Sequence, residues 1–159
     1  MRIAIASDRI GYVMKETIKN HLDEKNIDYY DFGCYELERC GYTEKTVKVC
    51  EAIEAGEFDR GILIDSNGVG VCIAANRYAQ IYAATVGEIY SARMTRRHNN
   101  ANVLCFGARI TGPAVVLEAV DTWLDTPFDG GSHVLLQQQI EKVRQEFLSA
   151  GGREEGETE

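Results

Sequence analysis

The sequence lacks several features that define whole classes of protein. It has no run of about 18 apolar residues, which excludes a membrane-spanning helix, and its start, MRIAIASDR, has neither the apolar segment nor the cleavage site of a secretory signal. Basic residues are few, with 17 Lys and Arg against 25 Asp and Glu, and the net charge of -8 repels phosphate backbones and anionic lipid. We therefore expect a cytoplasmic protein with no nucleic-acid partner and no membrane partner.

Common cofactor and metal motifs are also missing. The chain has no G-K-[ST] phosphate loop, no G-x-G-x-x-G dinucleotide pattern, no G-x-S-x-G elbow and no H-x-x-x-H pair. The three histidines are scattered along the chain, so we expect no metal site and no cofactor. Five cysteines, an odd number without C-x-x-C spacing, predict buried free thiols and no disulfides; they are Cys34, Cys40, Cys50, Cys72 and Cys105.

The length of 159 residues, 45% of them apolar, is typical of one domain with a full core. The last nine residues, GGREEGETE, carry -3 of the net charge of -8. We expect one domain over residues 1–150 and an acidic, disordered tail over 151–159.

Short β-rich runs alternate with longer segments of helical period. The pattern predicts strands at 2–6, 28–32, 60–64, 81–85 and 102–106, and helices at 11–25, 43–55, 69–77, 88–97 and 113–123. Gly56 marks a helix end and Pro113 a helix start. Repeated strand-then-helix units predict an α/β fold: a doubly wound, Rossmann-like, five-stranded parallel sheet with helices on both faces.

An additional C-terminal helix is predicted over 132–148, with apolar residues at 134, 135, 140, 143 and 147. No strand follows it. It packs either on a partner subunit or on its own sheet, and the sequence alone favours neither.

Ligands of an open parallel sheet bind outside the carboxyl ends of the strands. The predicted loops there contain Asp8, the segment D-S-N-G-V-G from Asp65 to Gly70, and Arg109. Gly68 and Gly70 let backbone N–H groups turn toward an anion. Asp65 is a candidate general base or, alternatively, a cap of the next helix. His98 closes the basic helix end R-M-T-R-R-H, where it either caps the helix or acts in catalysis.

Further motifs carry a resemblance to a known family. The segments MRIAIASD, EAIEAGEFDRGILI, GVGVCIAAN, YSARMTRRHNNANVLCFGARITGP and WLDTPFDGGSH resemble the ribose-5-phosphate isomerase B and galactose-6-phosphate isomerase subunit family over roughly residues 1–135. The resemblance implies aldose–ketose isomerisation through a cis-enediolate, without metal or organic cofactor. It also implies a homodimer, or a dimer of dimers, whose active sites span the subunit interface.

The same resemblance implies roles for individual residues. Asp8 binds the sugar, Tyr42 lines the pocket, Ser66 to Gly70 hold the enediolate, His98 opens the sugar ring and Arg109 binds phosphate. The expected catalytic residues are Asp65, Asn67 and His98, and the expected substrate-binding residues are Asp8, Arg9, Tyr42, Ser66, Gly68, Val69, Gly70, Asn99 and Arg109.

This chain departs from the family pattern at the base and at the phosphate site. The usual I-C-G-T-G-x-G motif has a Cys as the base, and Asp65 stands in its place. Arg9, Ser132 and Leu136 replace the usual His and two Arg around the phosphate, so Arg9 and Arg109 together would form the anion clamp. Three functions follow: an isomerase of a sugar phosphate, an isomerase of an unphosphorylated sugar or uronate, or a non-catalytic paralogue that serves as a subunit of a hetero-oligomeric isomerase.

Overall fold

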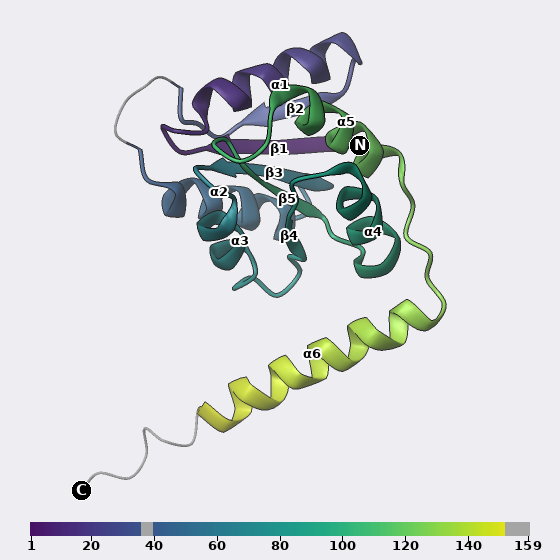
Figure 1. Cartoon of the computed structure of the whole chain (residues 1–159). Helices are drawn as coiled ribbons and strands as arrows, with labels where there is room; N and C mark the ends of the chain where they lie inside the picture. The colour runs from purple at the N-terminus through teal and green to yellow at the C-terminus, as the bar shows by residue number, and fades with distance from the viewer. Residues whose placement is uncertain (36–39, 152–159) are drawn as a thin grey trace, which may run out of the picture.

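The computed structural model describes residues 1–35 and 40–151, and its centre is one five-stranded sheet (Figure 1). The strands are β1 (Arg2–Ser7), β2 (Asp28–Asp31), β3 (Arg60–Asp65), β4 (Ala83–Thr85) and β5 (Val103–Gly107). Their order is β2-β1-β3-β5-β4, and all four pairings are parallel. The predicted fold is confirmed.

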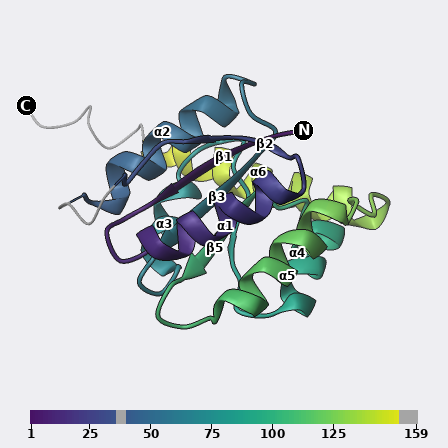
Figure 2. The ribbon, with the colours of Figure 1, turned by 90° about the horizontal axis from the view of Figure 1, so that it is seen from above.

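Helices cover both faces of this sheet. On one face lie α2 (Tyr42–Glu54) and α3 (Val69–Ala75); on the other lie α1 (Tyr12–Glu24), α4 (Ile89–Asn99) and α5 (Pro113–Asp125), which Figure 2 shows side by side. Each face has its own apolar layer, one around Trp123 and Phe106 and the other around Val49 and Leu63. Because β1, β3 and β5 are buried on both faces, they read as near-continuous apolar runs in the sequence.

The predicted helix boundaries at Gly56 and Pro113 are confirmed. Gly56 has φ +75° and follows the C-cap of α2, while Pro113 is the first residue of α5. Among the described residues, no helix is long and apolar enough to cross a membrane.

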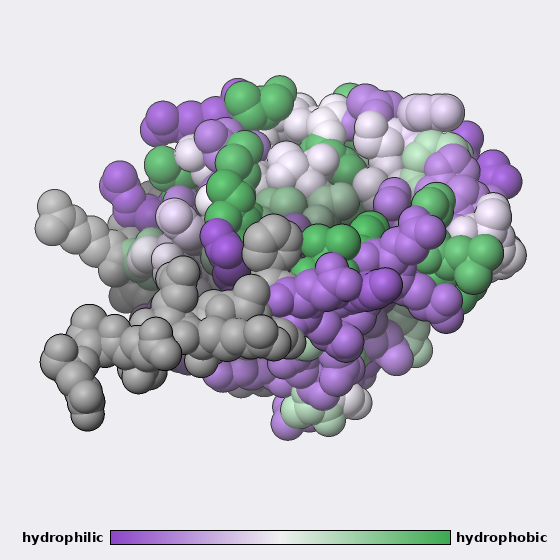
Figure 3. All heavy atoms as spheres, turned by 90° about the horizontal axis from the view of Figure 1, so that it is seen from below, coloured by the Kyte–Doolittle hydropathy of each residue, from purple (hydrophilic) through white to green (hydrophobic). Residues whose placement is uncertain are grey.

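The last helix, α6 (Ser132–Gly151), covers neither face of the sheet (Figure 1). It contacts α4, and the Gln137 amide donates to the Asn99 carbonyl over 2.6 Å. Its apolar side chains are largely exposed: Val134, Leu135, Leu136, Ile140 and Val143. Seen from below, the surface carries green hydrophobic patches beside purple hydrophilic side chains (Figure 3). Apart from Gly151, the predicted tail at 151–159 lies outside the described residues.

The expectation of free thiols throughout is wrong for one pair. Cys34 and Cys40 form a disulfide with a Cα–Cα distance of 6.2 Å. The chain leaves the end of β2 and returns to the start of α2, which brings the two Cα atoms within the range a disulfide can span. Cys50 and Cys105 are buried free thiols, as predicted, and Cys72 is half-buried.

Candidate functional site

Asp65 lies at the carboxyl end of β3, beside Gly107 of β5, and only 4% of it is exposed. Its Oδ1 accepts hydrogen bonds from the amides of Asn67, over 2.9 Å, and Gly68. Its Oδ2 accepts from the Val71 amide over 3.3 Å. The N-cap position of α3 is Gly68, not Asp65 as considered from the sequence, and the Asp65 carboxylate serves as the acceptor for amides of this turn from three residues earlier.

The second oxygen of Asp65 lies next to two other predicted site residues, Gly70 and Tyr42. A Cβ built on Gly70 would lie 3.1 Å from Asp65 Oδ2 and 2.9 Å from Cζ of Tyr42. Asp65, Gly70 and the ring of Tyr42 are thus neighbours, although Tyr42 comes from the start of α2. Because Oδ1 is anchored by two amides and Oδ2 by one longer contact, Oδ2 is the oxygen with room for a further partner.

The turn between Asp65 and α3 differs from the anion hole that the resemblance implies. Gly68 has φ +79°, and its amide donates to Asp65, while the Val69 amide donates to Asn67 Oδ1 over 3.0 Å. A side chain at Gly68 would clash with Thr85, whose hydroxyl donates to the Gly68 carbonyl. Two of the amides predicted to hold an enediolate therefore face acceptors of this chain.

Arg9 and Arg109 lie at the same edge of the sheet but line two separate cavities. Arg9 borders a cavity of about 280 Å³ together with Asp8, Cys40 and Gly41, and Asp8 Oδ1 accepts from the Gly11 amide over 2.8 Å. Arg109 borders a cavity of about 360 Å³, and Ile10 is common to both cavities. Neither arginine forms an ion pair with another described residue, so both cations are available to an anion.

His98 and Asn99 lie at the amino ends of the strands, whereas Asp65 lies at the carboxyl ends. Both belong to the last turn of α4, which leads into the amino end of β5. In the pairing of β3 with β5, Gly61 lies beside Val103 and Asp65 beside Gly107. The amino and carboxyl ends of these strands are therefore about 13 Å apart, at 3.3 Å per residue. One chain therefore does not bring Asp65 and His98 to one pocket.

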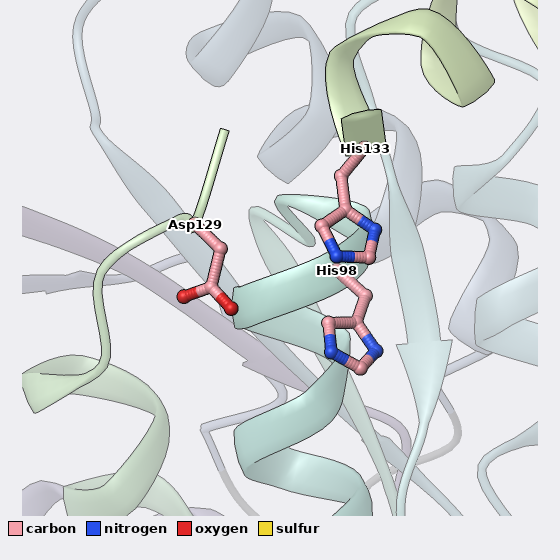
Figure 4. A group of neighbouring side chains, drawn as sticks. All are labelled: His98, Asp129 and His133. Atoms are coloured by element: carbon pink, nitrogen blue, oxygen red, sulfur yellow. The ribbon is translucent and has the colours of Figure 1, made fainter. Parts of the chain in front are cut away.

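His98 instead meets residues from the turn before α6 and from the first turn of α6 (Figure 4). Its ring stacks on that of His133 with centroids 4.4 Å apart, and Asp129 lies beside both rings. Asp129 is paired with Arg97 over 2.8 Å. The third histidine, His21, lies apart from this pair on α1, where its Nε2 is 2.8 Å from Asp121 Oδ1.

Neither His133 nor Asp129 is among the site residues predicted from the sequence. The signal available in the sequence was the D-G-G-S-H segment, in which two glycines can reverse the chain toward the preceding helix end.

Comparison with known proteins places this geometry in a family. The profile of the Ribose/Galactose Isomerase family matches residues 3–143. The chain belongs to this family. A Listeria innocua protein named ribose-5-P isomerase B is 39% identical over 145 residues, which are 91% of this chain and 98% of the relative. The resemblance seen in the sequence is thereby confirmed.

Solved structures of Ribose/Galactose Isomerase family members have the same fold. Ribose-5-phosphate isomerase B of Clostridium thermocellum superposes with a TM-score of 0.90 at 40% identity, covering 92% of this chain and 99% of that one. The enzyme from Mycoplasma genitalium, solved with bound ribulose-5-phosphate, has a TM-score of 0.84 at 35% identity, covering 91% and 97%.

Proposed function

We propose that this protein is an aldose–ketose isomerase that interconverts a sugar phosphate of the ribose 5-phosphate and ribulose 5-phosphate type. The observation that supports this most directly is the buried Asp65 carboxylate, anchored through Oδ1 and with Oδ2 next to Tyr42 and Gly70. Relatives that share about 40% of the sequence are ribose-5-phosphate isomerases B. The cytoplasmic location predicted from the sequence is part of the same proposal.

The reaction requires a base that moves one proton between adjacent carbons. In our proposal, Asp65 Oδ2 takes the proton from the carbon next to the carbonyl and returns it to the former carbonyl carbon, while the hydroxyl proton on the first of these carbons passes to the former carbonyl oxygen. The enediolate oxygen formed in between accepts hydrogen bonds from the Ser66 hydroxyl and the Gly70 amide. Neither is among the donors that Asp65 and Asn67 engage.

A second copy of the chain completes the site in this proposal. His98 would open the sugar ring by taking the proton of the ring-closing hydroxyl and donating one to the ring oxygen, and Asn99 would hydrogen-bond the sugar. Since both lie at the far edge of their own sheet, we assign them to the pocket of a neighbouring subunit. The exposed apolar side chains of α6 offer the contact area that such a dimer, or dimer of dimers, needs.

Arg9 and Arg109 are the proposed anion ligands. They lie on either side of Ile10 without acidic partners among the described residues, so one phosphate could be held between two adjacent cavities. Ser132 and Leu136 stand where the family usually has arginines, and Leu136 is 53% exposed. The loss of these two arginines favours a second candidate function, the isomerisation of an unphosphorylated sugar or uronate.

Two substitutions of Asp65 separate its role as a base from its role as a helix cap. Asp65→Asn keeps one oxygen for the amides of Asn67 and Gly68 but cannot accept a proton. Asp65→Cys loses the cap but restores an ionisable thiol. We expect Asp65→Asn to lower kcat by at least about 100-fold, the usual scale for general base catalysis, and Asp65→Cys to retain more activity despite lower stability.

The measurement is the initial rate with ribose 5-phosphate, free ribose and a uronate, together with the denaturation midpoint of each variant. Full activity of Asp65→Asn would show that Asp65 is only a cap and would refute the proposed base. If the wild type turns over free sugars and not the phosphate, the second candidate replaces the first. If it turns over nothing in the panel until a sister chain is added, the protein is a non-catalytic subunit.

A further inference from the structure

We propose that His98, Asp129 and His133 form a binding site for Zn²⁺ or a similar borderline divalent ion, and that such an ion inhibits the enzyme by occupying His98. The inhibitory part rests on the function proposed above for His98; the binding part does not. Each of the three residues offers one ligand atom, and these atoms all lie within 4.8 Å of one another (Figure 4). Two imidazoles and one carboxylate are a donor set that Zn²⁺ prefers.

The distances are compatible with closure around an ion. Zn–N and Zn–O bonds of about 2.0–2.1 Å put tetrahedral ligand atoms roughly 3.3 Å apart, so the three atoms need to approach by about 1.5 Å at most. The two imidazoles are stacked with only 13° between their planes, so at least one ring must also turn to aim its nitrogen lone pair at the ion. His98 and His133 are half-buried and Asp129 is exposed, which leaves room for this turn. Three protein ligands leave the fourth position of the ion open to water.

The backbone fixes the two halves of the site against each other. Gly130 and Gly131 have φ of +67° and +57°, and this turn sends Asp129 and His133 toward the end of α4. The Asp129 amide donates to the Arg97 carbonyl over 3.0 Å, and the His133 amide donates to the Gly130 carbonyl over 3.1 Å. The start of α6 is thus attached next to His98 before any ion arrives, which lowers the ordering cost of binding.

Arg97 orients the carboxylate and limits the affinity. Its Nη2 lies 2.8 Å from Asp129 Oδ2, and its Nε lies 3.1 Å from Oδ1. Both carboxylate oxygens of Asp129 accept from Arg97, which holds the carboxylate beside the two rings. The guanidinium also repels a cation, and we therefore expect reversible, micromolar binding and no permanently held structural ion.

Occupation of His98 has a direct chemical consequence. A ring nitrogen bound to a metal has no lone pair with which to take the hydroxyl proton of a closed sugar. Inhibition should therefore be reversed by a chelator and should weaken at higher concentrations of substrate, which would occupy the same pocket.

The test uses the full chain in a non-coordinating buffer at neutral pH. Zn²⁺ binding is followed by titration calorimetry, and Co²⁺ binding by its visible absorption. The variants are His133→Asn and Asp129→Asn, with His21→Asn as the matched control, because His21 also contacts an aspartate but lies on α1. Cys72→Ser controls for binding to the half-buried thiol.

We expect one ion per chain, at least 10-fold weaker binding in His133→Asn and Asp129→Asn, and unchanged binding in His21→Asn and Cys72→Ser. Absence of binding, equal binding in His133→Asn, or loss of binding in Cys72→Ser would overturn the site. Binding that leaves the isomerase rate unchanged would overturn the inhibition and the role of His98, while the site itself would stand.

Discussion

Mixing two inactive variants offers a direct test of where the active site lies. The variants Asp65→Asn and His98→Asn each remove one proposed catalytic group, so each pure protein should be inactive. In one chain these groups lie at opposite ends of the strands, which are about 13 Å long between Gly61 and Asp65, whereas proton transfer needs contacts of about 3 Å. If each site takes Asp65 from one chain and His98 from another, a mixed dimer contains one site with both substitutions and one site with neither.

The size of the recovered activity follows from this geometry. Random exchange of subunits makes half of the dimers mixed, and each mixed dimer has one intact site of two, so activity should return to about one quarter of wild type. Purified mixed dimers, isolated with two different affinity tags, should reach about one half. The assay is the initial rate before and after exchange, with each variant mixed with itself as the control. A rate that stays at the level of the parents, in mixed dimers shown to be present, would refute the shared site.

Two further predictions concern charge. Arg109→Ala should raise KM for a phosphorylated sugar by roughly 10- to 150-fold, because one charged hydrogen bond contributes about 1.5–3 kcal/mol. KM for the free sugar should change little. Equal increases in KM for both sugars would argue against a contact between Arg109 and phosphate. Desolvation opposes ionisation of Asp31, but hydrogen bonds led by that from the buried Lys15 lower the pKa of this carboxyl below its ordinary 3.8. The contribution of this carboxylate to the free energy of unfolding is constant above pH 3.8 and is lost as the pH falls through the lowered pKa of the native state. Asp31→Asn should therefore reduce the fall in stability at acid pH, measured as the denaturation midpoint against pH. An unchanged fall would contradict the stabilising role of Asp31.

The fold can be predicted from the sequence because the β-rich runs and the segments of helical period alternate, and residues such as Gly56 and Pro113 mark where helices end and begin. The segment 61–64 has no polar side chain, and the structure buries these four residues. Helix ends marked by Gly56 and Pro113 fall where expected. The predicted strand at 81–85 is shorter in the structure, Ala83–Thr85, because β4 is an edge strand with one neighbour.

The site is less predictable because its contacts join distant segments. The proximity of His98 and His133 depends on the path of the chain after α5, and no local pattern encodes that path. The disulfide between Cys34 and Cys40 depends on the loop between β2 and α2 in the same way. Asp65 fits two roles by residue type alone; the hydrogen bonds to Oδ1 and Oδ2 show its contacts with the turn before α3, and its role as a base stays a prediction.

The carboxylate of Asp65 also has a consequence for the design of inhibitors. Compounds that mimic an enediolate, such as hydroxamates, gain affinity from amides that point at an anion. In this chain the amides of Asn67 and Gly68 already bind an anion that is tethered to the same loop and is therefore always present at high effective concentration. Such compounds should bind this enzyme more weakly than they bind family members that have the usual Cys at this position.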